Sequence, residues 1–150
     1  MSQVTENRVD HRVRHVETTE CWALLTSADI GRVAVIVEGS VEIFPVNYLV
    51  KDEAIFFSSA PGSKLIEITN HPEVTFEADG LSNGWRWSVV AKGLASRLMF
   101  DTDIEDSGVQ ALHSLTPSEK FNYVRISDSS LTGRLFRSSR RPRESVPATA

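Results

Sequence analysis

Four side chains that could donate to a phosphate lie within seven residues: Ser58, Ser59, Ser63 and Lys64. A phosphate needs fixed donors and a positive field, and the first turn of a helix provides both through unpaired backbone N–H groups and the macrodipole. Gly62 allows close approach of the backbone. If a strand ends at the two serines and a helix begins at Ser63, the donors converge on one spot. The alternative is an ordinary strand-to-helix turn with Lys64 in solvent.

The elements that would position these donors are short β-branched runs divided by turn residues, which is typical of antiparallel hairpins. We predict strands over residues 31–37, 41–50, 54–60, 73–79, 85–99 and 121–136. Short helices are predicted over residues 18–29, over residues 63–70 and from residue 101 onward. Because the strands follow one another in hairpins, the expected fold class is mainly β. We expect an antiparallel barrel with short accessory α-helices rather than a βαβ sheet.

Three local features refine these elements. Pro45 interrupts an extended run, and since proline cannot donate to a ladder it marks an edge, a bulge or a place where something other than a strand lies alongside. Thr18 or Thr19 is expected to cap the first helix. Gly93 is expected to bend or bulge the long strand that contains it.

The composition of the chain limits what kind of protein it encodes. With 150 residues, 41% hydrophobic and 24% charged, one globular domain is expected over residues 18–136. It is flanked by a polar arm over 1–17 with little structure of its own and a flexible basic tail over 137–150. The net charge of -4 argues against a general nucleic-acid binder. No secretory signal or membrane-spanning run is recognised, so we expect a cytoplasmic protein without a membrane partner.

Other residues that could do chemistry have plainer interpretations. The four histidines lack metal-ligand spacing, and the single cysteine, Cys21, excludes disulfides within the chain and Cys-rich zinc sites. Glu77 and Asp79 share one strand face, either as a carboxylate pair or as part of a solvated face. Trp87 fits a core or interface position, or contact with a cofactor. No catalytic acid, base or nucleophile stands out.

The ordered set of segments "GRVAV", "IFPVNYLV", "IFFSSAPGSKL", "VTFEAD", "GWRWSVVAKGLA" and "TGR" resembles the pyridoxamine 5′-phosphate oxidase-like family of split-barrel flavin-binding proteins. The likeness spans roughly residues 19–136. It implies a six-stranded split β-barrel that forms a homodimer, with FMN at two sites along the dimer interface.

The resemblance also implies the residues of the site. The family's phosphate-binding loop matches Phe57, Ser58, Ser59, Ser63 and Lys64. The strand along the isoalloxazine edge matches Pro45, Val46 and Asn47. The long strand that sends polar groups toward the flavin matches Trp87 and Ser88. Arg134 in "TGR" matches an arginine that reaches the flavin from the partner subunit.

The chain also departs from the family pattern. The segment "PVNYLV" lacks the arginine and lysine of the flavin strand in pyridoxamine phosphate oxidases proper, and the basic C-terminal substrate motif is not clearly present. We therefore expect an FMN-dependent oxidoreductase acting on a different small molecule. The alternatives are a deazaflavin- or haem-binding split barrel, a flavin carrier or sensor that is not an enzyme, and a scaffold that has lost its ligand.

Overall fold

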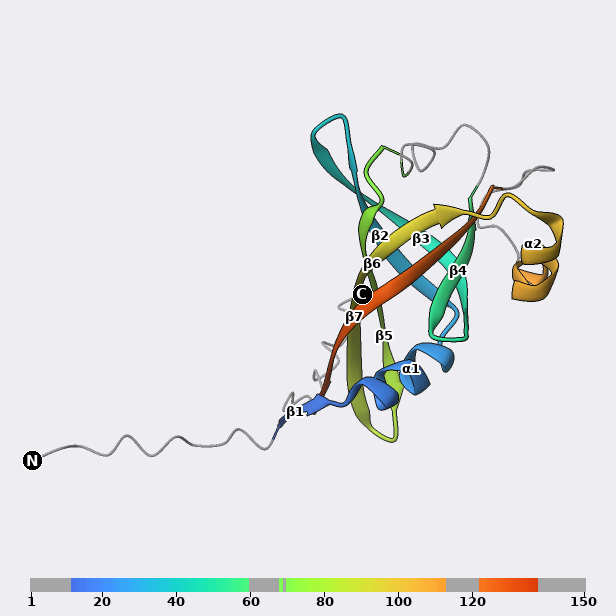
Figure 1. The fold of residues 1–150 in the computed structure, drawn as a ribbon. Coiled ribbons are helices and arrows are strands. Elements are labelled where there is room, and N and C mark those ends of the chain that lie inside the picture. Colours follow the sequence, from blue (N-terminus) through green and yellow to red (C-terminus); the bar gives the residue numbers. More distant parts are fainter. Residues whose placement is uncertain (1–11, 60–67, 69, 113–121, 138–150) are drawn as a thin grey trace, which may run out of the picture.

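The computed structural model describes residues 12–59, 68, 70–112 and 122–137, which form a ring of strands with short helices at its margins (Figure 1). In chain order the elements are β1 (Val13–Val16), α1 (Thr18–Thr26), β2 (Ile30–Val37), β3 (Ser40–Lys51), β4 (Ala54–Ser59), β5 (Glu73–Ser82), β6 (Trp85–Arg97), α2 (Asp101–Ser107), the short 3-10 helix η2 (Val109–Ala111) and β7 (Asn122–Phe136). All the strand pairings between these elements are antiparallel. The expected fold class, a mainly β antiparallel barrel with short helices, is confirmed.

The sheet closes on itself through its last strand. Its order is β1-β7-β4-β3-β2-β5-β6, and an additional pairing of β7 with β6 completes the ring. Neighbours in sequence pair as hairpins, namely β2 with β3, β3 with β4, and β5 with β6. The pairings of β2 with β5 and of β4 with β7 join segments that lie far apart in the sequence. A one-residue irregularity between Lys92 and Leu94 confirms the bulge expected at Gly93.

The core fills the inside of the ring because side chains alternate along each strand. In β2, Val33, Val35 and Val37 are buried, while Arg32 and Ile36 face outward. The largest fully buried side chains are those of Trp87, Phe57 and Phe76.

Two helical elements cover the margins of the barrel. Across one end, α1 buries Cys21 and Leu25, and the Tyr48 hydroxyl donates to the Leu25 carbonyl at 2.5 Å (Figure 1). Burial raises the pKa of Tyr48. Outside the ring, α2 and η2 lie beside β4 and share a second apolar cluster with Phe56 and Val109.

The region expected to be an unstructured arm contains a seventh strand. Residues 13–16 form β1 and pair with residues 133–136 of β7. The side chains of β1 are mostly exposed, so no alternation of apolar residues in the sequence predicted this strand. The reason for the strand lies in the partner, because β7 offers a row of backbone donors and acceptors along this stretch.

Several predicted boundaries are also wrong. The first helix ends at Thr26 rather than near residue 29, and its N-cap is Glu17 without a side-chain capping bond, so neither Thr18 nor Thr19 caps it. Both the backbone N–H and the hydroxyl of Ser27 bond to the Leu24 carbonyl and terminate the helix.

The predicted end of the strand over residues 73–79 is also wrong, and the helix predicted from residue 101 onward is short. The loop expected over residues 80–84 shrinks to a two-residue turn at Asn83 and Gly84, whose φ values are 50° and 78°. Positive φ at both central residues is what a tight hairpin turn requires, so β5 continues to Ser82. The helix that begins at residue 101 ends at Ser107, because Gly108 adopts a left-handed conformation with φ of 75°. The helix predicted over residues 63–70 falls largely outside the described residues.

Candidate functional site

The barrel opens between β3 and β4. These strands pair only from Tyr48 to Lys51, opposite Ala54 to Phe57. The earlier part of β3, from Ser40 to Asn47, pairs with β2, and no other described strand lies along its second edge. Pro45 is therefore on a strand edge, which confirms one of the three readings of that proline.

The register shows why a proline is tolerated at this position. Glu38 and Gly39 form a two-residue turn, so Val37 and Ser40 close the hairpin as a hydrogen-bonded pair. Hydrogen-bonded and non-bonded pairs then alternate, and the pair of Arg32 with Pro45 is non-bonded. The bond from Tyr48 N to Asp29 O, 3.0 Å long, agrees with this alternation. The ring nitrogen of Pro45 thus points to the open edge and costs β2 no ladder bond.

The expected phosphate donors lie on the other side of the opening. Ser58 and Ser59 end β4 and pair with Tyr123 and Asn122 of β7. If the β3–β4 ladder continued, Ser58 would face Asn47, so the described parts of the two expected groups flank the same split. Ser63 and Lys64 lie outside the described residues.

Ser58 carries an unsatisfied hydroxyl. Its side chain is 8% exposed, and its Oγ is buried without a hydrogen-bond partner among the residues that the structure describes. A buried donor without a partner costs about 1–3 kcal/mol. A phosphate at the end of β4 would satisfy this group, so this end of the barrel fits the phosphate of a flavin.

The side chains of Val46 and Phe57 face the core, where they are 4% and 0% exposed. They can offer only backbone groups to a ligand. Trp87 is also turned inward, and it packs against Gly80 so closely that a Cβ on that glycine would lie 2.7 Å from the indole Nε1. Trp87 is therefore a core residue of the described structure.

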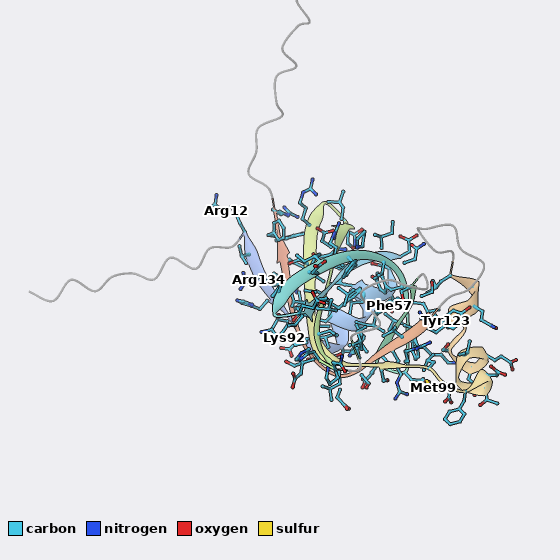
Figure 2. The ribbon with its side chains drawn as sticks, turned by 90° about the horizontal axis from the view of Figure 1, so that it is seen from above. Arg12, Phe57, Lys92, Met99, Tyr123 and Arg134 are labelled. Atoms are coloured by element: carbon cyan, nitrogen blue, oxygen red, sulfur yellow. The ribbon has the colours of Figure 1, made fainter. Side chains whose placement is uncertain are left out.

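Ser88 and Arg134 lie directly opposite each other on β6 and β7. Arg134 also faces His15 of β1, and Ser88 faces Asp79 of β5, so these polar residues form one row on the outer face of the sheet. They are separated from the serines of β4, because Arg134 lies 11 residues along β7 from Tyr123. That is about 36 Å of strand. Figure 2 shows Arg134 and Tyr123 on opposite sides of the molecule.

An ion-pair cluster that the sequence did not reveal occupies the middle of this outer face. The Arg32 guanidinium donates to Glu77 at 3.1 Å and to Asp79 at 3.4 Å. The hydrogen bond and charge of Glu77, with the charge of Asp79, raise the pKa of Arg32. Because Arg32 is also the cross-strand neighbour of Pro45, the cluster borders the open edge of β3. This ion-pair cluster depends on the pairing of β2 with β5, which no local sequence pattern specifies.

The described part of the chain lacks the features of two other kinds of site. No group of three or more His, Cys, Asp or Glu side chains there is arranged to hold a metal ion. None of the helices described is long and apolar enough to cross a membrane.

Comparison with known proteins gives consistent matches. Residues 17–135 match the model of the family described as pyridoxamine 5′-phosphate oxidase. A Corynebacterium glutamicum structure that carries that enzyme's name is 32% identical, with a TM-score of 0.74, over 87% of this chain and 98% of its own. The FAD-binding protein of Mycobacterium smegmatis is also 32% identical, with a TM-score of 0.70, over 83% of this chain and 99% of its own.

A curated relative adds no assigned activity. An uncharacterized Mycobacterium tuberculosis protein is 32% identical over 59% of this chain and 81% of its own length. The family match covers the whole ring from α1 to β7. The split between β3 and β4, the unsatisfied Ser58 hydroxyl and these matches agree with one another. The chain belongs to the pyridoxamine 5′-phosphate oxidase-like family of split-barrel, flavin-binding proteins.

Proposed function

We propose that this protein binds a flavin nucleotide at the opening between β3 and β4 and acts as a flavin-dependent oxidoreductase on a small molecule. The observation that carries the proposal is the buried Ser58 hydroxyl, which has no partner among the described residues. It lies across the split from the free edge of β3. The name of the Mycobacterium smegmatis relative, a FAD-binding protein, supports a flavin as the ligand.

Each expected residue has a defined role in this proposal. Ser58 and Ser59, with Ser63 and Lys64 of the following segment, hold the phosphate by charge-assisted hydrogen bonds. The edge of β3 from Pro45 to Asn47 lies along the polar rim of the flavin ring, with the backbone of Val46 between them. The bound flavin supplies hydride or electron transfer, and the protein supplies binding, orientation and electrostatics.

The second group of expected residues supports a homodimer. Ser88 and Arg134 are about 36 Å of strand away from Ser58, so in one copy they do not meet the phosphate end. We propose that the partner subunit's Arg134 reaches the flavin bound by the first copy. In this arrangement two sites form along the interface, and each of them is incomplete in a single chain.

FMN is the smallest flavin nucleotide that satisfies the site, because one terminal phosphate suffices for the Ser58 end. FAD contains the same half with an adenylate attached. The test is the visible spectrum of the protein purified from its host, with the mass of whatever denaturation releases. We expect a yellow flavin spectrum and the mass of FMN. The mass of FAD would change the identity of the cofactor and leave the rest of the proposal intact. A haem or deazaflavin spectrum, or a colourless protein that takes up no flavin, refutes the proposal.

A second measurement separates an enzyme from a carrier. Reduced nicotinamide or reduced deazaflavin is added to the flavin-loaded protein, and the flavin absorbance is followed. Bleaching that reverses when an acceptor is added is the expected result. If no donor bleaches the flavin, the protein is a carrier or sensor and the oxidoreductase part of the proposal is wrong.

A further inference from the structure

The outer face of the sheet contains a groove between the β2–β3 hairpin and strands β5 and β6. β2 pairs with β5 at only three positions, from Arg32 to Ala34, although β2 itself continues to Val37. Beyond the last pair the hairpin leaves the sheet and projects past the barrel (Figure 1). The gap has a volume of about 520 Å³ and reaches Val35 and Val74, which belong to the core. This volume is in the range of small-molecule pockets, about 300–1,000 Å³.

The walls of the groove are apolar and poorly covered. Ile36 and Val41 face each other across the hairpin and are 42% and 70% exposed, and Leu94 on the opposite wall is 43% exposed. Ile43, next along β3 on the same face, is 67% exposed. Contiguous exposed apolar side chains of this kind are typical of a surface that binds a ligand or another protein.

One cation, the exposed side chain of Lys92, lies at the groove. Lys92 lines the groove between Thr75 of β5 and Ser130 of β7, its cross-strand neighbours. Within the described residues it makes no hydrogen bond and no ion pair. Glu77, diagonally beside it on β5, is already bound by Arg32.

Two carboxylates limit what Lys92 can hold. Glu73 and Asp128 line the groove at its Leu94 end, and neither lies within ion-pair distance of Lys92. One lysine and two carboxylates give the groove lining a net charge of −1, so a dianion is repelled and an anionic group is attracted only next to Lys92. The groove therefore favours a monoanion over a dianion such as a phosphate monoester.

The groove and Pro45 share the outer face of the β2–β3 hairpin, although the groove borders β5 and the proposed flavin edge of β3 faces β4. Ile43 and Pro45 are two residues apart on β3, and side chains two apart share a face about 7 Å from each other. Ala34, which lines the groove, is the cross-strand neighbour of Ile43. A molecule that extends from the groove along this face would reach a ring at Pro45.

We propose that this groove is the substrate pocket, and that it takes a molecule with an apolar body of one or two rings and a single anionic group held by Lys92. The substrate role rests on the proposed flavin site. The apolar body of the molecule lies against Ile36, Val41 and Leu94, and the anionic group of the molecule lies next to Lys92.

Two fluorescent probes with the same aromatic body test the binding class. Anilinonaphthalene sulfonate carries one negative charge, and N-phenylnaphthylamine is neutral. We expect both to bind the full-length protein. Lys92→Gln should weaken the sulfonate about tenfold and leave the neutral probe unchanged, because only the charged contact is lost. Arg86→Gln makes the same charge change on an exposed residue outside the groove and should change neither affinity. Ala34→Trp should fill the groove and abolish both.

Several outcomes would overturn the proposal. Equal affinity of the sulfonate for the wild type and Lys92→Gln removes the anion-binding role. If neither probe binds the wild type, the groove is no small-molecule site. A Val41→Asp variant that then elutes as a smaller species would make it an interface between copies. Thermal melting of each variant identifies any that has lost its fold.

The flavin reports whether the pocket is next to the ring. Naphthalene carboxylate, a monoanion without interfering fluorescence, is titrated into the flavin-loaded protein. We expect it to displace the sulfonate probe and to shift the flavin spectrum in the same concentration range. Displacement without a spectral shift overturns the substrate role alone. A chain that binds the probes but no flavin refutes the proposed function, and the substrate role falls with it.

Discussion

Removing the Ser58 hydroxyl should have opposite effects on the stability of the flavin-free protein and on its affinity for flavin. The Oγ atom is buried without a partner among the described residues, and such a group costs about 1–3 kcal/mol. Ser58→Ala removes that cost, so the free energy of unfolding of the flavin-free protein should rise by about 1 kcal/mol. For a chain of this size the melting temperature should rise by about 2–4 °C.

The same substitution removes a donor to the phosphate. Losing one charge-assisted hydrogen bond should lower flavin affinity about tenfold, or about 1.4 kcal/mol. Calorimetric melting of the flavin-free protein measures the first effect, and titration of flavin followed by fluorescence quenching measures the second. A purely structural role of Ser58 would not raise the stability of the flavin-free protein and lower its affinity for flavin at the same time.

Ser129 provides a matched control. Its Oγ is the other buried hydroxyl without a described partner, and it lies by Gly93 at the bulge between β6 and β7. Ser129→Ala should stabilise the flavin-free protein by a similar amount and leave flavin affinity unchanged. The reasoning is refuted if Ser58→Ala binds flavin as tightly as the wild type, or if it destabilises the flavin-free protein by more than about 1 kcal/mol.

Three further expectations follow from the site and the core. Lys64→Ala should lower flavin affinity by about 1–3 kcal/mol in the same titration, and unchanged binding would remove this lysine from the site. Gly80→Ala places a Cβ 2.7 Å from the Trp87 indole and should cost about 1–3 kcal/mol in urea unfolding; a neutral result would mean that the ring moves freely. Tyr48 has its pKa raised by burial, so its phenol ionises in the unfolded chain first and stability should fall as pH rises above about 10. Tyr48→Phe loses the bond to Leu25, costing about 1 kcal/mol, and should flatten that alkaline decline; an unchanged slope assigns it to other groups.

Local sequence patterns were enough to predict what depends on neighbouring residues. The hairpin of β2 with β3 follows from β-branched runs and turn residues. The missing N–H of Pro45 limited that position to an edge, a bulge or a place where something other than a strand lies alongside, and the structure shows the edge. The phosphate site at the end of β4 was predicted from residue types together with the family resemblance, and it stays a prediction. However, Ser58 and Ser59 point to opposite faces, and only the structure shows which hydroxyl lacks a partner.

What the sequence did not predict depends on contacts between distant segments. The pairing of β2 with β5 brings Arg32 to Glu77, 45 residues away, and opens the groove where that pairing stops. β1 forms only because β7 offers it an edge, and its exposed side chains carry no apolar signal. The register between distant strands depends on the packing of the whole barrel, so it cannot be predicted from any short stretch of neighbouring residues.

The position of β7 has a consequence for synthesis of the protein. This 15-residue strand is the last described element of the chain, yet it pairs with β1, β4 and β6 and closes the ring. Until β7 leaves the ribosome, the facing edges of β4 and β6 have no partner, and they can pair with other nascent chains. The barrel can therefore close only after β7 has been translated. Premature termination before Asn122 should yield aggregates rather than a smaller soluble domain.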